Sequence, residues 1–326
     1  MTTAAKRDLS VGPNLDPILH RLACPESHEP LSRQGSMLVS RSGRNRYSID
    51  ECGIPLFAEQ FCSADGLAQQ KHYDRIANAY AENLEYPHTI AYMEYLDDEL
   101  RDVIGDGELG QCVELCCGTG EAMSLFSESM RECVGVDVST SMLHKGRQAL
   151  DMPHLHFVQG DATRLPLADE SCDTVVILGG IHHVPDRQAL FREACRVLRP
   201  GGSFVWREPV SDFWLWRVLR AVVYRLSPIL DHDTERPLLY DETVPVLEDA
   251  GFRLQEWRTC GFIGFCLLMN SDVLYFNRLL RFIPGIRAIS KGFARVDRWC
   301  TRLPGLRRSG LQVVGKAIKP IEERAT

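Results

Sequence analysis

Residues 113–121, VELCCGTGE, constrain the fold of this chain more than any other segment. An apolar run over residues 112–115 leads into a loop with two closely spaced glycines, and a helix-compatible segment follows. Glycine lets the backbone turn tightly and lets a ligand approach without a Cβ in the way. At the end of a parallel strand, such a loop is where open α/β sheets bind nucleotide-like ligands. The segment therefore predicts an α/β fold with a ligand at this loop.

A second apolar run, residues 133–138, contains Asp137, about 20 residues beyond the loop, where an acidic side chain can bind the hydroxyls of a ribose. A dinucleotide site also needs a third glycine for close helix–strand packing, and the bulky Met123 occupies that position. The loop has no Lys or Arg to bind a pyrophosphate. These residues favour a nucleoside ligand without phosphates.

The loop resembles the first motif of the class I S-adenosylmethionine-dependent methyltransferases, an acidic residue followed by three alternating glycines. Glu114, Gly118 and Gly120 match that motif, and Cys116 stands where the first glycine is usual. This CCGTG variant is most similar to the ubiquinone/menaquinone C-methyltransferase group. Asp137 matches the acid that binds the ribose in this family.

Further motifs of this family follow in the expected order. The GDA sequence at 160–162 fits the adenine-side motif, residues 165–167 and 172–176 fit the fourth strand and its approach, and LRPGG at 198–202 fits the turn into the fifth. The resemblance implies a Rossmann-like methyltransferase fold, a doubly wound, mostly parallel seven-stranded sheet, and S-adenosyl-L-methionine as cofactor. The cofactor-binding residues that it implies are Tyr73, Glu114, Cys116, Gly118, Gly120, Asp137, Asp161 and Ala162. Tyr73 and Tyr80 are candidates to cover the methionine end, and packing in the core is an equal alternative for both.

Composition limits the other classes of protein. With 326 residues the chain can bury a large core and hold one small extra module. A net charge of −7 argues against broad, non-specific nucleic-acid binding. The 12 scattered cysteines suit reduced thiols better than a disulfide scaffold, and we find neither a secretory leader nor the ~20-residue apolar run that spans a bilayer. We therefore expect a cytoplasmic protein, with peripheral contact at the inner face of a membrane left open.

Residues 1–65 resemble the small zinc-ribbon module that precedes some bacterial methyltransferases, including a ribosomal-RNA guanine methyltransferase. Structural zinc needs four Cys or His ligands. Only Cys24 remains of the motif, because Ser27, Ser40 and Gly43 stand at the other ligand positions. We therefore expect a metal-free module, and metal analysis of the purified protein should find no stoichiometric zinc.

Residues 66–326 form the expected methyltransferase domain, with cap insertions at about 211–240 and 262–310. Apolar residues recur at helical spacing from 213 to 226, and the charges among them are Arg217, Arg220 and Arg225. From 273 to 308 there are nine Lys and Arg residues against Asp297 alone. A basic amphipathic helix can lie in a membrane interface or cover a hydrophobic anionic substrate. The alternative is two packed helices whose arginines are solvated.

Candidate catalytic residues follow the fourth and fifth strands, where the family places its methyl acceptor. His182 and His183 follow the fourth strand, Glu208 follows the fifth, and His232 lies in an acidic cluster within the first insertion. The histidine pair resembles that of small-molecule and sugar O-methyltransferases, and it can equally be structural. A general base is worth typically 10²–10⁴-fold where the acceptor must lose a proton.

The leading interpretation is S-adenosylmethionine-dependent methyl transfer to a small, hydrophobic or lipid-linked acceptor. Three alternatives remain open: a soluble O-methyltransferase of sugars or secondary metabolites, an rRNA base methyltransferase, and a non-catalytic cofactor-binding scaffold. The acidic balance and the missing zinc ligands count against the RNA enzyme. The acceptor atom and the oligomeric state are not determined by the sequence.

Overall fold

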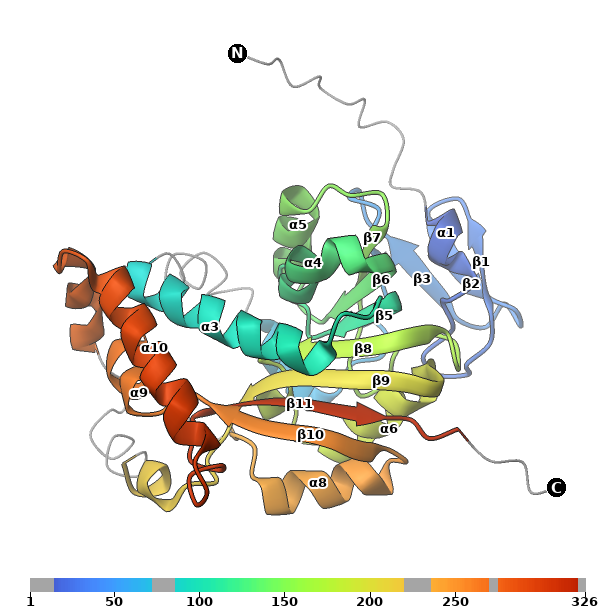
Figure 1. Cartoon of the computed structure of the whole chain (residues 1–326). Helices are drawn as coiled ribbons and strands as arrows, with labels where there is room; N and C mark the ends of the chain where they lie inside the picture. The colour runs from blue at the N-terminus through green and yellow to red at the C-terminus, as the bar shows by residue number, and fades with distance from the viewer. Residues whose placement is uncertain (1–14, 72–85, 220–235, 270–274, 322–326) are drawn as a thin grey trace, which may run out of the picture.

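The computed structural model describes residues 15–71, 86–219, 236–269 and 275–321 (Figure 1). Within these residues eleven strands form one sheet in the order β1-β2-β3-β4-β7-β6-β5-β8-β9-β11-β10. The strands are β1 (Leu31–Gln34), β2 (Met37–Ser40), β3 (Arg46–Ile49), β4 (Pro55–Leu56), β5 (Gly110–Leu115), β6 (Met130–Asp137), β7 (Leu155–Gln159), β8 (Cys172–Leu178), β9 (Leu198–Pro209), β10 (Arg253–Cys260) and β11 (Gln312–Ile318).

Helices cover both faces of the sheet. They are α1 (Asp16–Leu19), α3 (Pro87–Ile104), α4 (Glu121–Phe126), α5 (Thr140–Ala149), α6 (Arg187–Val197), α8 (Tyr240–Asp249), α9 (Ile263–Leu268) and α10 (Ile286–Arg302), with the 3₁₀ turns η1 (Ser127–Ser129), η2 (Ile181–His183) and η3 (Tyr275–Phe282). Residues 64–71 and 214–219 are also helical. Helices α3, α4 and α5 pack on one face, and α1, α6 and α8 pack on the other (Figure 1).

Seven neighbouring strands, β7-β6-β5-β8-β9-β11-β10, form the methyltransferase-type sheet that the sequence predicts. Strands β5 to β9 pair in parallel, and β11 runs antiparallel to both of its neighbours. The central strands are buried along nearly their whole length, as expected for a parallel sheet covered by helices on both faces. The fold class predicted from the motifs is confirmed.

The N-terminal module extends this sheet. Strands β1 to β4 form an antiparallel meander that joins the edge of β7 where Leu56 pairs in parallel with Gln159. Cys24 lies in the core of the module, fully buried, with its Sγ 3.0 Å from the hydroxyl of Tyr47. The last remaining cysteine of the zinc-ribbon pattern is thus part of a small apolar core.

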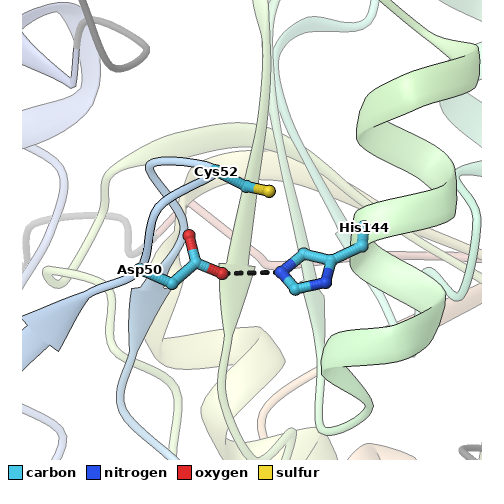
Figure 2. A group of neighbouring side chains, drawn as sticks. All are labelled: Asp50, Cys52 and His144. Atoms are coloured by element: carbon cyan, nitrogen blue, oxygen red, sulfur yellow. Dashed lines mark hydrogen bonds and ion pairs between the residues drawn. The ribbon is translucent and has the colours of Figure 1, made fainter. Parts of the chain in front are cut away.

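A loop of the module also contacts α5. In Figure 2, His144 from α5 points at Asp50, and their Nε2 and Oδ2 atoms lie 2.6 Å apart. The other Asp50 oxygen accepts the backbone N–H of Ile54. Cys52 stands beside them, and burial together with the neighbouring Asp50 raises the pKa of its thiol. The hydrogen bond accounts for the closeness of these side chains and fixes the loop on the methyltransferase domain.

Mild acid is expected to destabilise the fold through His156 of β7. Burial lowers the pKa of this histidine from 6.5 to about 4, although Glu132 Oε1 lies 3.8 Å from its Nε2. Below pH 6.5 the unfolded chain therefore binds a proton that folded His156 does not take up until about pH 4. By linkage this removes up to about 3 kcal/mol of stability as the pH falls through that range. In urea unfolding, His156→Gln should lose this part of the pH slope, and an unchanged slope would contradict the assignment.

Candidate active site

A cavity of about 520 Å³ lies at the carboxyl ends of the parallel strands, within the size range of small-molecule sites. Four segments at the ends of the strands line it: residues 116–121 after β5, 136–138 at the end of β6, 160–163 after β7, and 178–180 with 183–186 after β8. Residues of α5 and of the segment 63–69 complete the wall. The cavity thus forms where the glycine loop predicts a ligand.

Glu114 holds the loop after β5 in place from below. Its carboxylate is buried and accepts the backbone N–H groups of Ala122 and Met123, at 2.8 and 2.9 Å, in the first turn of α4. Burial raises the pKa of Glu114 to about 8. The residue does not line the cavity. Its predicted contact with the cofactor is therefore corrected to a supporting role, because a carboxylate can satisfy the exposed N–H groups that begin a helix.

Cys116 occupies a position whose backbone favours glycine. Its φ is +49°, as left-handed as the +52° of Gly118, and only glycine adopts this region without a steric cost. Position 180 must be glycine because of this cysteine, since a Cβ on Gly180 would lie 2.6 Å from the Cys116 Cβ. The family's first glycine is thus replaced here by a strained residue, and its side chain fills space that Gly180 leaves open.

Asp137 lines the cavity at the end of β6. One carboxylate oxygen accepts the backbone N–H of Gly118 and the other that of Ser139, both at 2.8 Å. These bonds tie the end of β6 to the glycine loop. A carboxylate has about four acceptor positions, so this geometry suits a group that also receives the hydroxyls of a ribose.

Asp161 links the cavity to the N-terminal module. One of its oxygens accepts the backbone N–H and hydroxyl of Ser63, at 2.8 and 2.6 Å, and the other accepts the same two groups of Thr163. Burial alone would raise the pKa of Asp161, but these four hydrogen bonds hold it below its usual range. Asp161 and the adjacent Ala162 both line the cavity, as predicted, and the aspartate is already fully used as a clamp.

Sequence reasoning missed the wall formed by residues 63–69. Ser63, Gly66 and Gln69 line the cavity, although they lie far before the motifs in the sequence, at the end of the N-terminal module and just after it. The Gln69 Oε1 atom is buried and has no hydrogen-bond partner among the described residues. A buried acceptor left unpaired costs about 1–3 kcal/mol. It therefore fits a ligand that brings an N–H or O–H donor, such as the amino group or hydroxyls of a nucleoside.

Of the two neighbouring histidines, His183 lines the cavity and His182 lies behind it. The ring centroid of His183 lies 3.8 Å from that of His182. The Nδ1 atom of His182 lies 2.7 Å from a carboxylate oxygen of Glu208. Glu208 is fully buried and also accepts the backbone N–H groups at 180, 181 and 182. Of the three predicted catalytic residues in this region, only His183 faces the ligand space, and Glu208 and His182 form its support.

An ion-paired arginine lies beneath the glycine loop. Arg207 of β9, which is 6% exposed, contacts Asp97 of α3 at 2.8 Å and Glu121 of the loop at 2.6 Å. Burial raises the pKa of Asp97 to about 6 against the opposing effect of Arg207. The arginine connects α3 to the wall of the cavity. Three predicted residues, Tyr73, Tyr80 and His232, lie outside the described residues.

Known proteins that are similar in sequence to this chain are methyltransferases. Residues 113–206 match the family described as "Methyltransferase domain". Demethylmenaquinone methyltransferases are 39% identical over 102 residues in Staphylococcus saprophyticus (30% of this chain, 44% of that protein) and 37% identical over 143 residues in Beutenbergia cavernae (43% of this chain, 59% of that protein). The chain spans less than two thirds of the length of these curated relatives.

Two solved structures share the fold. A SAM-dependent methyltransferase of Thermotoga maritima is 19% identical, with a TM-score of 0.51, and the match covers 77% of this chain and 99% of that one. The cyclase SpnF is 16% identical, with a TM-score of 0.53, and the match covers 78% and 96%. At such identities the likeness concerns the fold alone, and the two names show that one fold carries different chemistries.

Motifs, fold and cavity lead to the same conclusion. The strand order of the seven-stranded sheet, the left-handed glycine loop and Asp137 at the second strand end fit a nucleoside donor without phosphates. Residues 113–206 are a methyltransferase domain of the class I S-adenosylmethionine-dependent type, and this domain implies S-adenosyl-L-methionine as the cofactor.

Proposed function

We propose that this protein transfers a methyl group from S-adenosylmethionine to a small hydrophobic acceptor of the quinone class. The observation that carries the proposal is that His183 and the glycine loop line one cavity. The wall beside His183 is apolar, with Leu178, Val184 and Pro185. The name of the sequence relatives, demethylmenaquinone methyltransferase, supports a quinone-type acceptor.

For this reaction the protein has to align the methyl donor with the acceptor and to remove one proton from the acceptor. Bound S-adenosylmethionine supplies a methyl group on a positively charged sulfur. The sulfur–methyl bond breaks as a bond to the acceptor forms, and a ring-carbon or hydroxyl acceptor loses one proton. Holding donor and acceptor in line is worth up to ~7–11 kcal/mol. In this proposal His183 receives the proton, which adds typically 10²–10⁴-fold.

Asp137 and Gln69 would bind the nucleoside half of the cofactor. Asp137 accepts the ribose hydroxyls, and the unpaired Oε1 of Gln69 accepts a donor from the ligand. Glu208 orients His182, whose ring lies against His183 and restricts its rotation. The role of Glu208 is therefore positioning, since it does not line the cavity.

Transfer of a labelled methyl group tests the proposal. The full chain, labelled S-adenosylmethionine and a chemically reduced naphthoquinone that lacks the ring methyl should give the ring-methylated quinone and S-adenosylhomocysteine. Catechols, sugars and ribosomal RNA serve as competing acceptors in parallel reactions. Transfer to one of these instead of the naphthoquinol would replace the proposed acceptor class. Cofactor binding without transfer to any of them would favour a non-catalytic scaffold.

A further inference from the structure

Helix α10 buries a face of mainly small and polar residues and exposes an apolar face, the reverse of an ordinary surface helix. Its buried positions include the small or polar residues Ser290, Ala294, Asp297 and Thr301. Its solvent-exposed positions include Ile289, Phe293, Val296 and Trp299, whose exposed fractions are 45, 44, 55 and 64%. The spacing of three and four residues places these four side chains on one face of the helix. A surface helix normally turns such a face toward the core.

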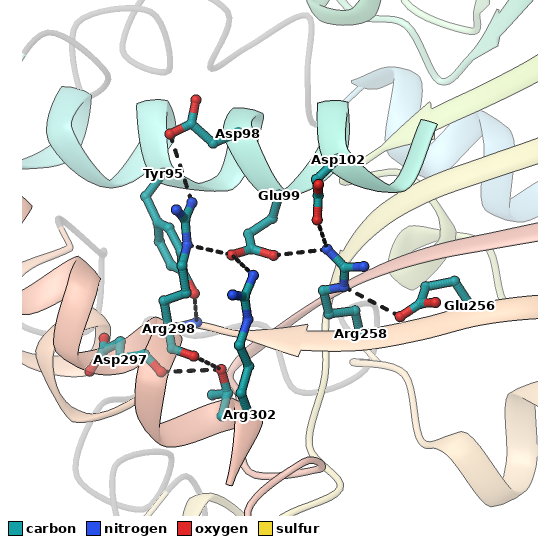
Figure 3. Close-up of polar contacts among 11 residues, drawn as sticks. Tyr95, Asp98, Glu99, Asp102, Glu256, Arg258, Asp297, Arg298 and Arg302 are labelled. Carbon is teal, nitrogen blue, oxygen red and sulfur yellow. Dashed lines mark hydrogen bonds and ion pairs between the residues drawn. The ribbon is translucent and has the colours of Figure 1, made fainter. Parts of the chain in front are cut away.

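Ion pairs fix the helix in this orientation. In Figure 3, Arg298 of α10 points at α3, and its guanidinium lies 2.6 Å from the buried Glu99 and 3.7 Å from Asp98. Arg302 reaches the same Glu99 at 3.6 Å. Turning the apolar face inward would separate both arginines from Glu99, which would keep only its contact with Arg258 of β10 at 3.3 Å.

Asp297 fixes the opposite side of α10. Its carboxylate accepts backbone N–H groups of Phe262, Gly264 and Phe265 at the start of α9, at 2.9, 3.0 and 2.7 Å. The arginines that the sequence analysis placed on a membrane-facing or solvated surface therefore include a set that holds α10 against α3. Arg298 and Arg302 thus pair with Glu99 of α3, distant in sequence, while Arg302 stays 59% exposed, so the two interpretations of the basic helices remain predictions.

The exposed apolar surface continues into the preceding turn. Leu279 and Phe282 of η3 are 65 and 68% exposed, and η3 adjoins α10 in space as well as in sequence. We call these two residues together with Ile289, Phe293, Val296 and Trp299 the apolar face. Large exposed apolar side chains gathered on neighbouring elements are typical of an interaction site.

Charge and composition identify the partner of the apolar face. Residues 273–308 carry nine basic residues and one acidic residue. Carboxylates of α3 and α8 pair with five of the nine, Arg287, Lys291, Arg298, Arg302 and Arg308. Arg281 and Arg295 are exposed, and the Arg281 guanidinium stacks 4.7 Å above the ring of Phe282. Tryptophan and phenylalanine bordered by arginine are typical of helices that lie in a bilayer interface. We propose that the apolar face inserts into the surface of an anionic lipid bilayer.

The topology places this surface at the same edge of the sheet as the cavity. Strand β11 is antiparallel to both β9 and β10, so β10 runs parallel to β9. The carboxyl end of β10 leads into α9, and the carboxyl ends of the parallel strands border the cavity. None of the described helices is long and apolar enough to cross a bilayer. Docking would bring the active-site edge near the lipid, and this consequence for the acceptor rests on the proposed function.

Sedimentation with vesicles tests the docking. The full chain should bind vesicles of phosphatidylglycerol and phosphatidylcholine, and should bind pure phosphatidylcholine vesicles more weakly. Phe293→Ser with Trp299→Ser should weaken binding to the anionic vesicles at least about tenfold, since burying one such side chain is worth that much or more. Ile321→Ser is the matched control, because Ile321 is 71% exposed outside the insertion, and it should bind like the native chain. Arg295→Glu should weaken binding and reduce its salt dependence.

Two results would overturn the docking proposal. One is equal vesicle binding by the native chain and the double variant. The other is a native dimer that becomes monomeric in the double variant, with no vesicle binding by either, which would make the apolar face a contact between two copies. Methyl transfer to a water-soluble naphthoquinol is measured beside these assays. If it persists while vesicle binding is absent, the docking fails and the proposed function stands.

Discussion

Replacing His183 by alanine is expected to lower kcat by about 10²–10⁴-fold, the usual contribution of a general base. His183 is the histidine of the pair that lines the cavity, where the proposed reaction would remove the proton of the acceptor. The affinity for S-adenosylmethionine, measured by calorimetry, should stay within about twofold, because cofactor binding is assigned to other residues. The variant separates turnover from cofactor binding in a single protein.

Two further variants distinguish a base from a structural residue. His182→Ala should lower kcat less than His183→Ala, since His182 acts only through its contact with the neighbouring ring. Glu208→Gln should likewise lower kcat less than His183→Ala, because Glu208 acts only through its hydrogen bond to His182. Equal losses of kcat in all three variants, with a lowered melting temperature, would mean that the pair only holds the loop together.

Asp137→Ala is expected to weaken S-adenosylmethionine binding by tenfold or more. The variant removes a charged acceptor, worth ~1.5–3 kcal/mol, from the ribose hydroxyls. It also leaves the N–H groups of Gly118 and Ser139 without the oxygens that join the glycine loop to β6. Calorimetry measures the affinity, and Glu128→Ala, at an exposed carboxylate of η1, is the matched control. Native-like affinity in Asp137→Ala would remove the ribose assignment, and preferential NADH binding would change the cofactor.

Local signals in the sequence predicted the parallel sheet, and two of its helices have caps that are equally local. Ser139 begins α5 by accepting the N–H of Met142, and Asp186 begins α6 by accepting that of Ala189. Both caps lie within three residues of their partners, so the sequence contains the whole interaction. The glycine loop and Asp137 are likewise a strand-end pattern that the parallel sheet brings together.

Contacts between residues that are distant in sequence could not be predicted from the sequence. At the start of α8, Asp212 accepts the N–H of Tyr240, across 28 residues. Gln69 reaches the cavity only because the module docks on the sheet edge. The orientation of α10 depends on Glu99 of α3, and periodicity alone indicates an amphipathic helix without saying which face is buried.

The hydrogen bonds between Ser63 and Asp161 change what counts as the catalytic unit. A fragment cut at the family boundary near residue 113 would keep the motifs and lose Ser63, Gly66 and Gln69 from the wall. Asp161 would then be a buried carboxylate short of two donors, facing an open site. The residues that resemble a zinc ribbon can therefore lose their thiolates without loss of the wall, whereas their excision would leave the cofactor exposed to solvent on one side. Through Ser63, the N-terminal module forms part of the cavity wall.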